Sequence, residues 1–141
     1  MSEHPQTYTK PLPSLQGLSG AFYGWCARGE LRFQRCSACA RWRHVPRELC
    51  AHCGSFEWTW ERSSGRGKVF SWTEVVRALH PDFGDETPYA PVIVEMQEGV
   101  RMLSRVLDCP PDALRIDLPL EVQFVAVHES LSLPLFRPVA Q

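Results

Sequence analysis

The chain has 141 residues, of which 44% are hydrophobic and 22% are charged, the composition of a folded globular protein with room for one ordinary domain. Its formal net charge of −1 gives no overall positive field that would draw the protein to nucleic acid or to anionic membranes. No stretch approaches the roughly 20 apolar residues that cross a bilayer, and the polar, proline-bearing beginning lacks the apolar segment of a signal peptide. We therefore expect a cytoplasmic protein without a membrane partner.

The first predicted elements are a loose leader and a short helix. Residues 1–14 contain three prolines and few apolar groups. From residue 15 to residue 29, apolar side chains recur at steps of three and four, which predicts one apolar helix face formed by Leu15, Leu18, Phe22 and Trp25. Such a helix is too short to be stable alone, so this face docks either on the protein's own core or on a partner. We assign residues 1–30 to the leader and docking helix.

Four cysteines follow in two close pairs, with the spacing C-x2-C, ten residues, C-x2-C; they are Cys36, Cys39, Cys50 and Cys53. Two residues between cysteines let both sulfurs point inward from one tight turn, and two such turns complete a tetrahedron of thiolates. The pattern predicts one structural Zn²⁺, with iron in the same ligand set or a redox-active pair as the alternatives. Because four thiolates fill the coordination shell, we expect the ion to stabilise the fold and to have no catalytic role.

We do not expect the other two cysteines or the histidines within the motif to bind the metal. His44 and His52 lie inside the motif, and we expect them at the surface or next to the ligands. Cys26 and Cys109 are unpaired by spacing, and we expect them to be small buried apolar side chains, with a reactive thiol as the alternative.

From Phe56 onward the sequence predicts mainly β structure. Strands are expected over residues 68–78, 91–96, 100–107 and 120–127, a helical turn over 109–115, and a proline-containing tail at the end. About five short strands, with one long loop over residues 80–89, predict a small OB-type barrel, and a β-sandwich fragment is the alternative. The predicted fold is therefore mainly β, with a zinc ribbon in residues 31–60 followed by a five-stranded OB-fold barrel in residues 61–141.

Several sequence blocks together resemble one known family, the domain-of-unknown-function thirty-five family. The blocks are FYGWCARGELRFQRCSAC, PREL before CAHCGS, SGRGKVFSWTEV, PYAPVIVEMQEGVRMLSRV and DLPLEVQF, and they occur in the family's order between about Phe22 and Pro138. The family pairs a rubredoxin-like zinc ribbon with an OB-fold. The chain departs from the family at two turns, where Ala40 and Asp117 stand at positions that are usually glycine.

The resemblance implies a non-catalytic accessory subunit. Members of the family are usually encoded beside thiolase-fold enzymes and form complexes with thiolases, with aldolases of the sterol-carrier-protein-thiolase type, or with ketosynthase-like acyltransferases. In these complexes the small protein is needed for structure or for holding the coenzyme A thioester. The resemblance thus implies a thiolase-fold partner in a hetero-oligomer, an acyl-CoA at or near the interface, and no catalytic residue in this chain.

Two groups of cations are candidates for contact with coenzyme A. Arg62, Arg66 and Lys68 lie on or beside the glycine-containing segment 63–68, where cations and backbone N–H groups can approach phosphates. A solvated turn is the alternative. On the ribbon, an adenine ring or a neighbouring subunit could be covered by Trp42, Arg43, His44 and Arg47, and an exposed polar turn is again the alternative.

Two further functions stay open. Zinc ribbons and OB-folds also bind single-stranded nucleic acid, but this chain combines its aromatic residues with acidic groups in the long loop and has no excess of cations. An independent enzyme would use His80 or Cys109, yet the sequence has no nucleophile motif, glycine-rich phosphate loop or open-shell metal pattern. Both functions are therefore weaker predictions than an accessory subunit.

Overall fold

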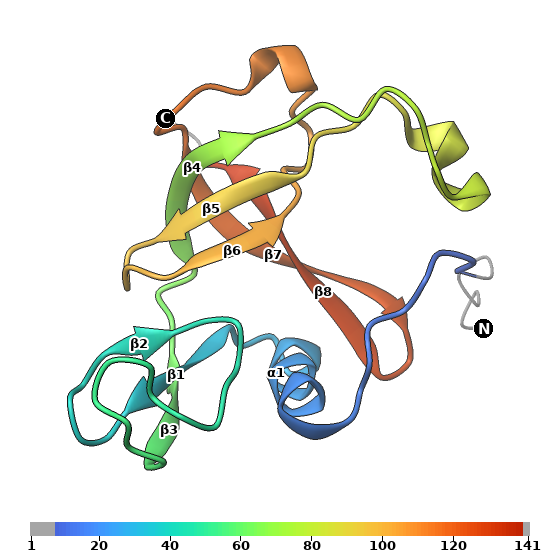
Figure 1. Ribbon diagram of the computed structural model, residues 1–141. Helices are drawn as coiled ribbons and strands as arrows, with labels where there is room; N and C mark the ends of the chain where they lie inside the picture. The colour runs from blue at the N-terminus through green and yellow to red at the C-terminus, as the bar shows by residue number, and fades with distance from the viewer. Residues whose placement is uncertain (1–7, 140–141) are drawn as a thin grey trace.

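A computed structural model describes residues 8–139, in which one helix and a small sheet lie against a larger curled sheet (Figure 1). The first seven residues of the predicted leader and the last two of the predicted barrel lie outside the described residues. The prediction of a mainly β protein with an N-terminal helix, a zinc ribbon and an OB-fold is confirmed.

Helix α1 (Gly17–Ala27) buries one face in the protein's own core. Phe22 and Cys26, four residues apart and therefore on one face, are 4% and 1% exposed, whereas Leu15 precedes the helix and is 45% exposed. The helix ends at Ala27, and just beyond it Gly29 has a φ of 79°, in the left-handed region, and donates its N–H to the Cys26 carbonyl. Within residues 8–139, no helix is long and apolar enough to cross a membrane.

The zinc-ribbon region is built on a three-stranded antiparallel sheet in the order β2-β1-β3. Its strands are β1 (Arg32–Cys36), β2 (Trp42–Arg43) and β3 (Trp58–Arg62). The central strand β1 fully buries two neighbouring side chains, Phe33 and Gln34. Since neighbouring residues of a strand point to opposite faces, both faces of β1 are covered.

The OB-fold is a five-stranded antiparallel sheet in the order β6-β5-β4-β7-β8. The strands are β4 (Arg66–Trp72), β5 (Val92–Met96), β6 (Arg101–Ser104), β7 (Pro119–His128) and β8 (Leu131–Pro138). The sheet curls until the chain just after β6 meets β8 at the parallel bridge between Val106 and Phe136. There the Phe136 N–H donates to the Arg105 carbonyl at 3.0 Å, and the Leu107 N–H donates to the Phe136 carbonyl at 2.6 Å.

The structure corrects two of the predicted β segments. The strand expected over residues 68–78 ends at Trp72, and residues 73–89 project from the barrel as an arm that contains the 3₁₀ helix η1 (Pro81–Glu86). The predicted tail is strand β8, the partner of β7 along nearly its whole length. Pro134 lies in β8, a strand at the end of the sheet order, where a missing backbone N–H is tolerated.

One hydrophobic core joins the helix, the ribbon and the barrel. It contains Phe22 of α1, Phe33 of β1, Val94 of β5 and Phe136 of β8. The link between ribbon and barrel is held at Ser63, whose hydroxyl donates to a Glu98 carboxylate oxygen at 2.6 Å, while the Ser64 N–H donates to the other oxygen at 3.1 Å. The ribbon is thereby fixed to the tip of the β5–β6 hairpin.

Candidate metal centre and its surroundings

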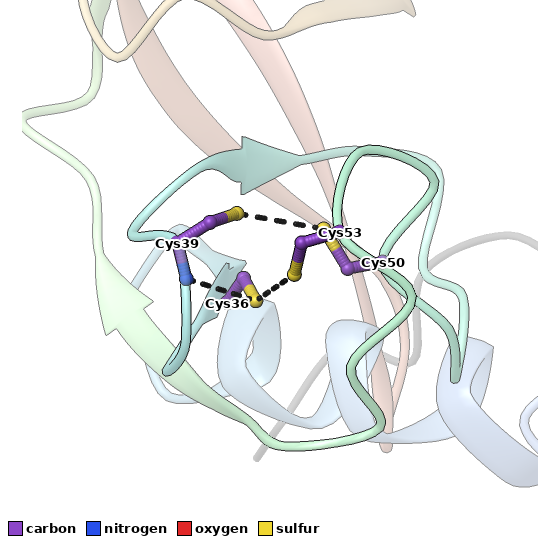
Figure 2. A group of neighbouring side chains, drawn as sticks. All are labelled: Cys36, Cys39, Cys50 and Cys53. Carbon is purple, nitrogen blue, oxygen red and sulfur yellow. Dashed lines mark hydrogen bonds between the residues drawn. The ribbon is translucent and has the colours of Figure 1, made fainter.

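The four cysteines predicted as zinc ligands meet at one point of the ribbon, as Figure 2 shows. Their sulfur atoms all lie within 4.8 Å of one another, and the Cys36–Cys53 and Cys39–Cys50 Sγ pairs are each 3.6 Å apart. Four thiolates at about 2.3 Å from a tetrahedral zinc ion lie about 3.8 Å apart, so the arrangement fits this ion. The chain therefore contains a rubredoxin-like zinc ribbon with its cysteine cluster assembled.

Two similar turns present these sulfurs. In the first turn the Ala40 N–H donates to the Cys36 carbonyl, and in the second the Gly54 N–H donates to the Cys50 carbonyl, both at 2.9 Å. Ala40 and Gly54 have φ angles of 65° and 79°, so both turns need a residue in the left-handed region. Ala40 thus keeps the geometry of the glycine usual in the family, at a cost of about 1–2 kcal/mol for its Cβ atom.

Backbone donors favour the thiolate form of two of the cysteines. The pKa of Cys50 is lowered to about 6, mainly because the N–H groups of Cys53 and His52 donate to its sulfur. The pKa of Cys36 is also lowered, chiefly by the N–H of Cys39, which lies 3.5 Å from the Cys36 sulfur. Since the thiolate is the form that binds a metal, these donors prepare the Cys36 and Cys50 sulfurs for coordination. At Cys53, by contrast, the Ser55 N–H opposes the shift, but burial and the neighbouring sulfurs raise the pKa to about 12.

His44, which was expected at the surface or next to the ligands, is half-buried: its ring packs against the core, and it also lines a hollow that Cys50 borders. Its ring centroid lies 5.0 Å from that of Phe22 and 5.2 Å from that of Phe33. Burial lowers the pKa of His44 to about 4, so the ring is neutral at neutral pH. Cys26 is a buried apolar side chain, as predicted, and burial raises the pKa of its thiol to about 12.

The cations expected to contact coenzyme A phosphates are exposed, Arg62 at the end of β3 and Arg66 and Lys68 on β4. Arg62 is 3.4 Å from a Glu30 carboxylate oxygen, and Lys68 is 3.3 Å from one of Asp117, whereas Arg66 has no acidic partner within residues 8–139. The Ser64 N–H, one of the backbone donors expected to face a phosphate, instead donates to Glu98. Phosphate contact at this loop therefore stays a prediction.

A groove of about 750 Å³ in the barrel was not predicted from the sequence. Its lining is mostly apolar and comes largely from the arm and the loops between Phe83 and Leu114, with Val125 and Val127 of β7 and Leu133 and Leu135 of β8 on another side. Glu86 of the arm lies at its rim, and Lys10 and Arg105 hold the pKa of Glu86 below its usual range, although partial burial opposes this shift. The groove is lined by segments far apart in the sequence, and β8, one of them, was expected to be a tail, so the sequence pattern did not point to it.

Family models match both halves of the chain. Residues 26–59 match the rubredoxin-like zinc ribbon domain of ChsH2, and residues 60–125 match the C-terminal OB-fold domain of ChsH2. The predicted zinc ribbon and OB-fold are thus each matched by a family model.

Individual relatives are bacterial and archaeal. The chain is 33% identical over 129 residues to a probable enoyl-CoA hydratase alpha subunit of Thermomonospora curvata, covering 92% of this chain but only 40% of that subunit. It is 32% identical over 105 residues to a DUF35 domain-containing scaffold protein of Methanothermobacter thermautotrophicus, covering 72% of this chain and 77% of that protein. Among solved structures, one titled Ltp2-ChsH2(DUF35) aldolase contains a chain with a TM-score of 0.81 and 33% identity, covering 90% of this chain and 98% of that one.

Proposed function

Because the chain belongs to the DUF35 family of paired zinc-ribbon and OB-fold domains, we propose that it is a non-catalytic accessory subunit of a thiolase-fold enzyme that acts on an acyl-CoA. The observation that carries this proposal is the similarity, over nearly the whole chain, to a ChsH2(DUF35) chain in a structure whose title also names Ltp2 and an aldolase. The names of the relatives, a scaffold protein and a hydratase subunit, support a role within a larger assembly.

In this proposal the zinc ion is a structural component. Cys36, Cys39, Cys50 and Cys53 are its four ligands, which the cluster geometry supports. When bound, the ion would tie the two turns of the ribbon together, and four thiolates would leave it no position for water or substrate. The described ribbon strands have few buried residues of their own, so the metal contributes much of the free energy that holds the turns.

The ribbon also carries exposed apolar side chains that suit a protein interface. Phe56 is 70% exposed, and Val45 and Leu49 are 54% and 45% exposed. Leu49 and Phe56 border the same open hollow of about 650 Å³ between the second cysteine turn and the start of α1. A surface of this kind is disfavoured in water and is covered when a partner binds.

Contact with the acyl-CoA is the finer part of the proposal. Coenzyme A would lie at or near the interface, with the partner providing the reacting groups. Arg62, Arg66 and Lys68 are the proposed phosphate contacts on this chain, and Arg66 is the one without an acidic partner in the described part of the chain. A guanidinium without an acidic partner can form two hydrogen bonds with a phosphate.

The test is to express the chain with the thiolase-fold enzyme encoded beside it and to assay each protein alone and both together. The acyl-CoA turnover is measured as thiolysis or as retro-aldol cleavage. We expect turnover only, or at least tenfold faster, with both proteins present. An enzyme with full activity in the absence of this chain, or turnover by this chain alone, would contradict an accessory role.

A further inference from the structure

Another hollow lies on the ribbon next to the metal centre, separate from the barrel groove and adjoining the 650 Å³ hollow at Arg47, Leu49 and Ala51. It has a volume of about 440 Å³ and is bordered by Cys50, by the second cysteine turn and by β2. Three of its ten lining residues are arginines, two are histidines and none is acidic; the arginines are Arg41, Arg43 and Arg47. The volume is in the range of sites that bind small molecules.

The arginines of this hollow are not neutralised by the protein. Within residues 8–139, no carboxylate lies within ion-pair distance of any of the three, although Arg32, Lys68, Arg101 and Arg105 each have such a partner. Residues 31–60 contain five arginines, two glutamates and no lysine or aspartate, a formal charge of +3 in a chain whose total is −1. With the −2 of a zinc tetrathiolate included, residues 31–60 carry +1 and the rest of the chain −4, so the ribbon remains the positive part of the chain.

One of the arginines is held in a fixed position by a buried amide. The Arg43 Nε donates to the Gln34 Oε1 at 2.9 Å, and the Arg43 Nη2 donates to the Arg47 carbonyl at 2.7 Å. The same Gln34 oxygen accepts the Arg47 backbone N–H at 2.8 Å, and Gln34 is fully buried. The backbone at Arg47 and the guanidinium of Arg43 are thus positioned before any ligand arrives, which lowers the entropy cost of binding.

The geometry points to a binding site in this hollow for a small molecule that carries a diphosphate ester. Arginine side chains match phosphate oxygens in paired hydrogen bonds, and Arg41 and Arg47 are the lining arginines with donors left for a ligand, because Arg43 donates within the protein through Nε and Nη2 and its Nη1 is buried. Two such cations at one hollow suit a ligand with two phosphate groups. The site is distinct from the 63–68 loop, where Glu98 already accepts a backbone donor. Coenzyme A contains a diphosphate, and naming it as the ligand rests on the proposed function. The existence of a positively charged hollow does not depend on that function.

A competing role for the arginines is charge balance at the metal centre. Four thiolates around one Zn²⁺ carry a net charge of −2, and Cys50 borders the hollow. If this is their only role, removing them weakens zinc binding and leaves anion binding unchanged. Zinc content therefore has to be measured together with anion affinity.

The experiment uses the zinc-loaded full chain and isothermal titration with pyrophosphate, ADP and coenzyme A. The test variant is Arg41→Ser with Arg47→Ser, and the control is Arg77→Ser with Arg115→Ser, which removes the same charge from exposed sites outside the hollow. We expect saturable binding of all three ligands, in competition with one another, weakened at least tenfold in the test variant and less than twofold in the control. Each variant should retain one zinc ion per chain.

The location of the site is checked independently by the changes in backbone amide chemical shifts when ligand is added to the unaltered protein. This measurement needs no variant, so it does not depend on whether a variant folds. The proposal expects the largest shifts over residues 41–52. Shifts confined to residues 63–68, an equal loss of affinity in both variants, no saturable binding, or zinc loss with unchanged anion affinity would each overturn it. All of these results are obtained without a partner enzyme, so they are distinguishable from a failure of complex formation.

Discussion

Replacing Phe22 by alanine tests whether helix α1 belongs to this protein's own core. The ring is 4% exposed, lies 6.5 Å from the stacked ring of Phe33, and contacts His44 at a centroid distance of 5.0 Å. Deleting a buried phenylalanine ring typically costs about 3–5 kcal/mol, because transfer free energy is lost and a cavity remains. Since Phe22 joins the helix to both the ribbon and the barrel, we expect Phe22→Ala to lose about 4 kcal/mol.

The measurement is urea unfolding of the zinc-loaded protein, followed by circular dichroism. With an m value of about 2 kcal/mol/M, a loss of about 4 kcal/mol lowers the midpoint by about 2 M. Leu15→Ala is the matched control, because Leu15 is apolar and close in sequence but 45% exposed, and its replacement should cost less than about 0.5 kcal/mol. A loss below about 1 kcal/mol for Phe22→Ala, or equal losses for both variants, would show that the helix face is not a core element.

Four further predictions concern the ribbon and its link to the barrel. The pKa of His44 is about 4 in the folded protein and ordinarily 6.5, so the unfolded chain takes up the proton first as the pH is lowered through 6.5. The free energy of unfolding should therefore fall by about 1.4 kcal/mol between pH 7.5 and pH 5.5. This loss should vanish in His44→Gln. Glu98→Ala removes the acceptor for two donors of the link, so the free energy of unfolding in urea should fall by about 1–3 kcal/mol and hydrogen exchange at the Ser64 amide should become faster. Gln97→Ala is the control, because Gln97 is exposed and its replacement should change neither quantity. Ala40→Gly relieves a residue with a φ of 65° and should raise the free energy of unfolding by about 1 kcal/mol, seen as a higher thermal midpoint; a lower midpoint would mean that the turn is not strained. Cys50→Ser should abolish stoichiometric zinc binding measured by elemental analysis, whereas Cys109→Ser should retain one ion per chain.

The cysteine cluster and most of the barrel could be predicted because their signals are local. Two residues between cysteines fix the shape of each turn, and the order of the two pairs fixes the cluster. The hairpin between β5 and β6 is likewise local, with Gly99 at a φ of 93° where the sequence placed the turn. Such features need no knowledge of distant contacts.

The missed features depend on contacts between distant residues. Strand β8 was predicted as a tail because Pro134 breaks the strand pattern, and only its position at the end of the sheet order makes this proline acceptable. His44 was expected at the surface or next to the ligands because four thiolates fill the metal shell, and its contact with the Phe22 ring depends on a separate element. Residues 73–78 have strand-forming side chains but leave the sheet, since the arm meets itself at the bridge between Val75 and Tyr89.

The candidate functional surfaces likewise combine local sequence signals, which could be predicted, with contacts between distant residues, which could not. Arg43 and Arg47 could be singled out from the sequence as a cationic group, but their shared contact with the buried side chain of Gln34 comes from the pairing of β1 with β2. The barrel groove depends on β8 and therefore had no sequence signal of its own. Local motifs thus identified the metal centre, and the sheet pairing determined what surrounds it.

The most direct measurement of the accessory role is the native mass of this chain after co-purification with the thiolase-fold enzyme proposed as its partner. We predict one particle that contains both proteins and one zinc ion for each copy of this chain. Two separate species at micromolar concentration under reducing conditions, with zinc still bound to this chain, would contradict the account.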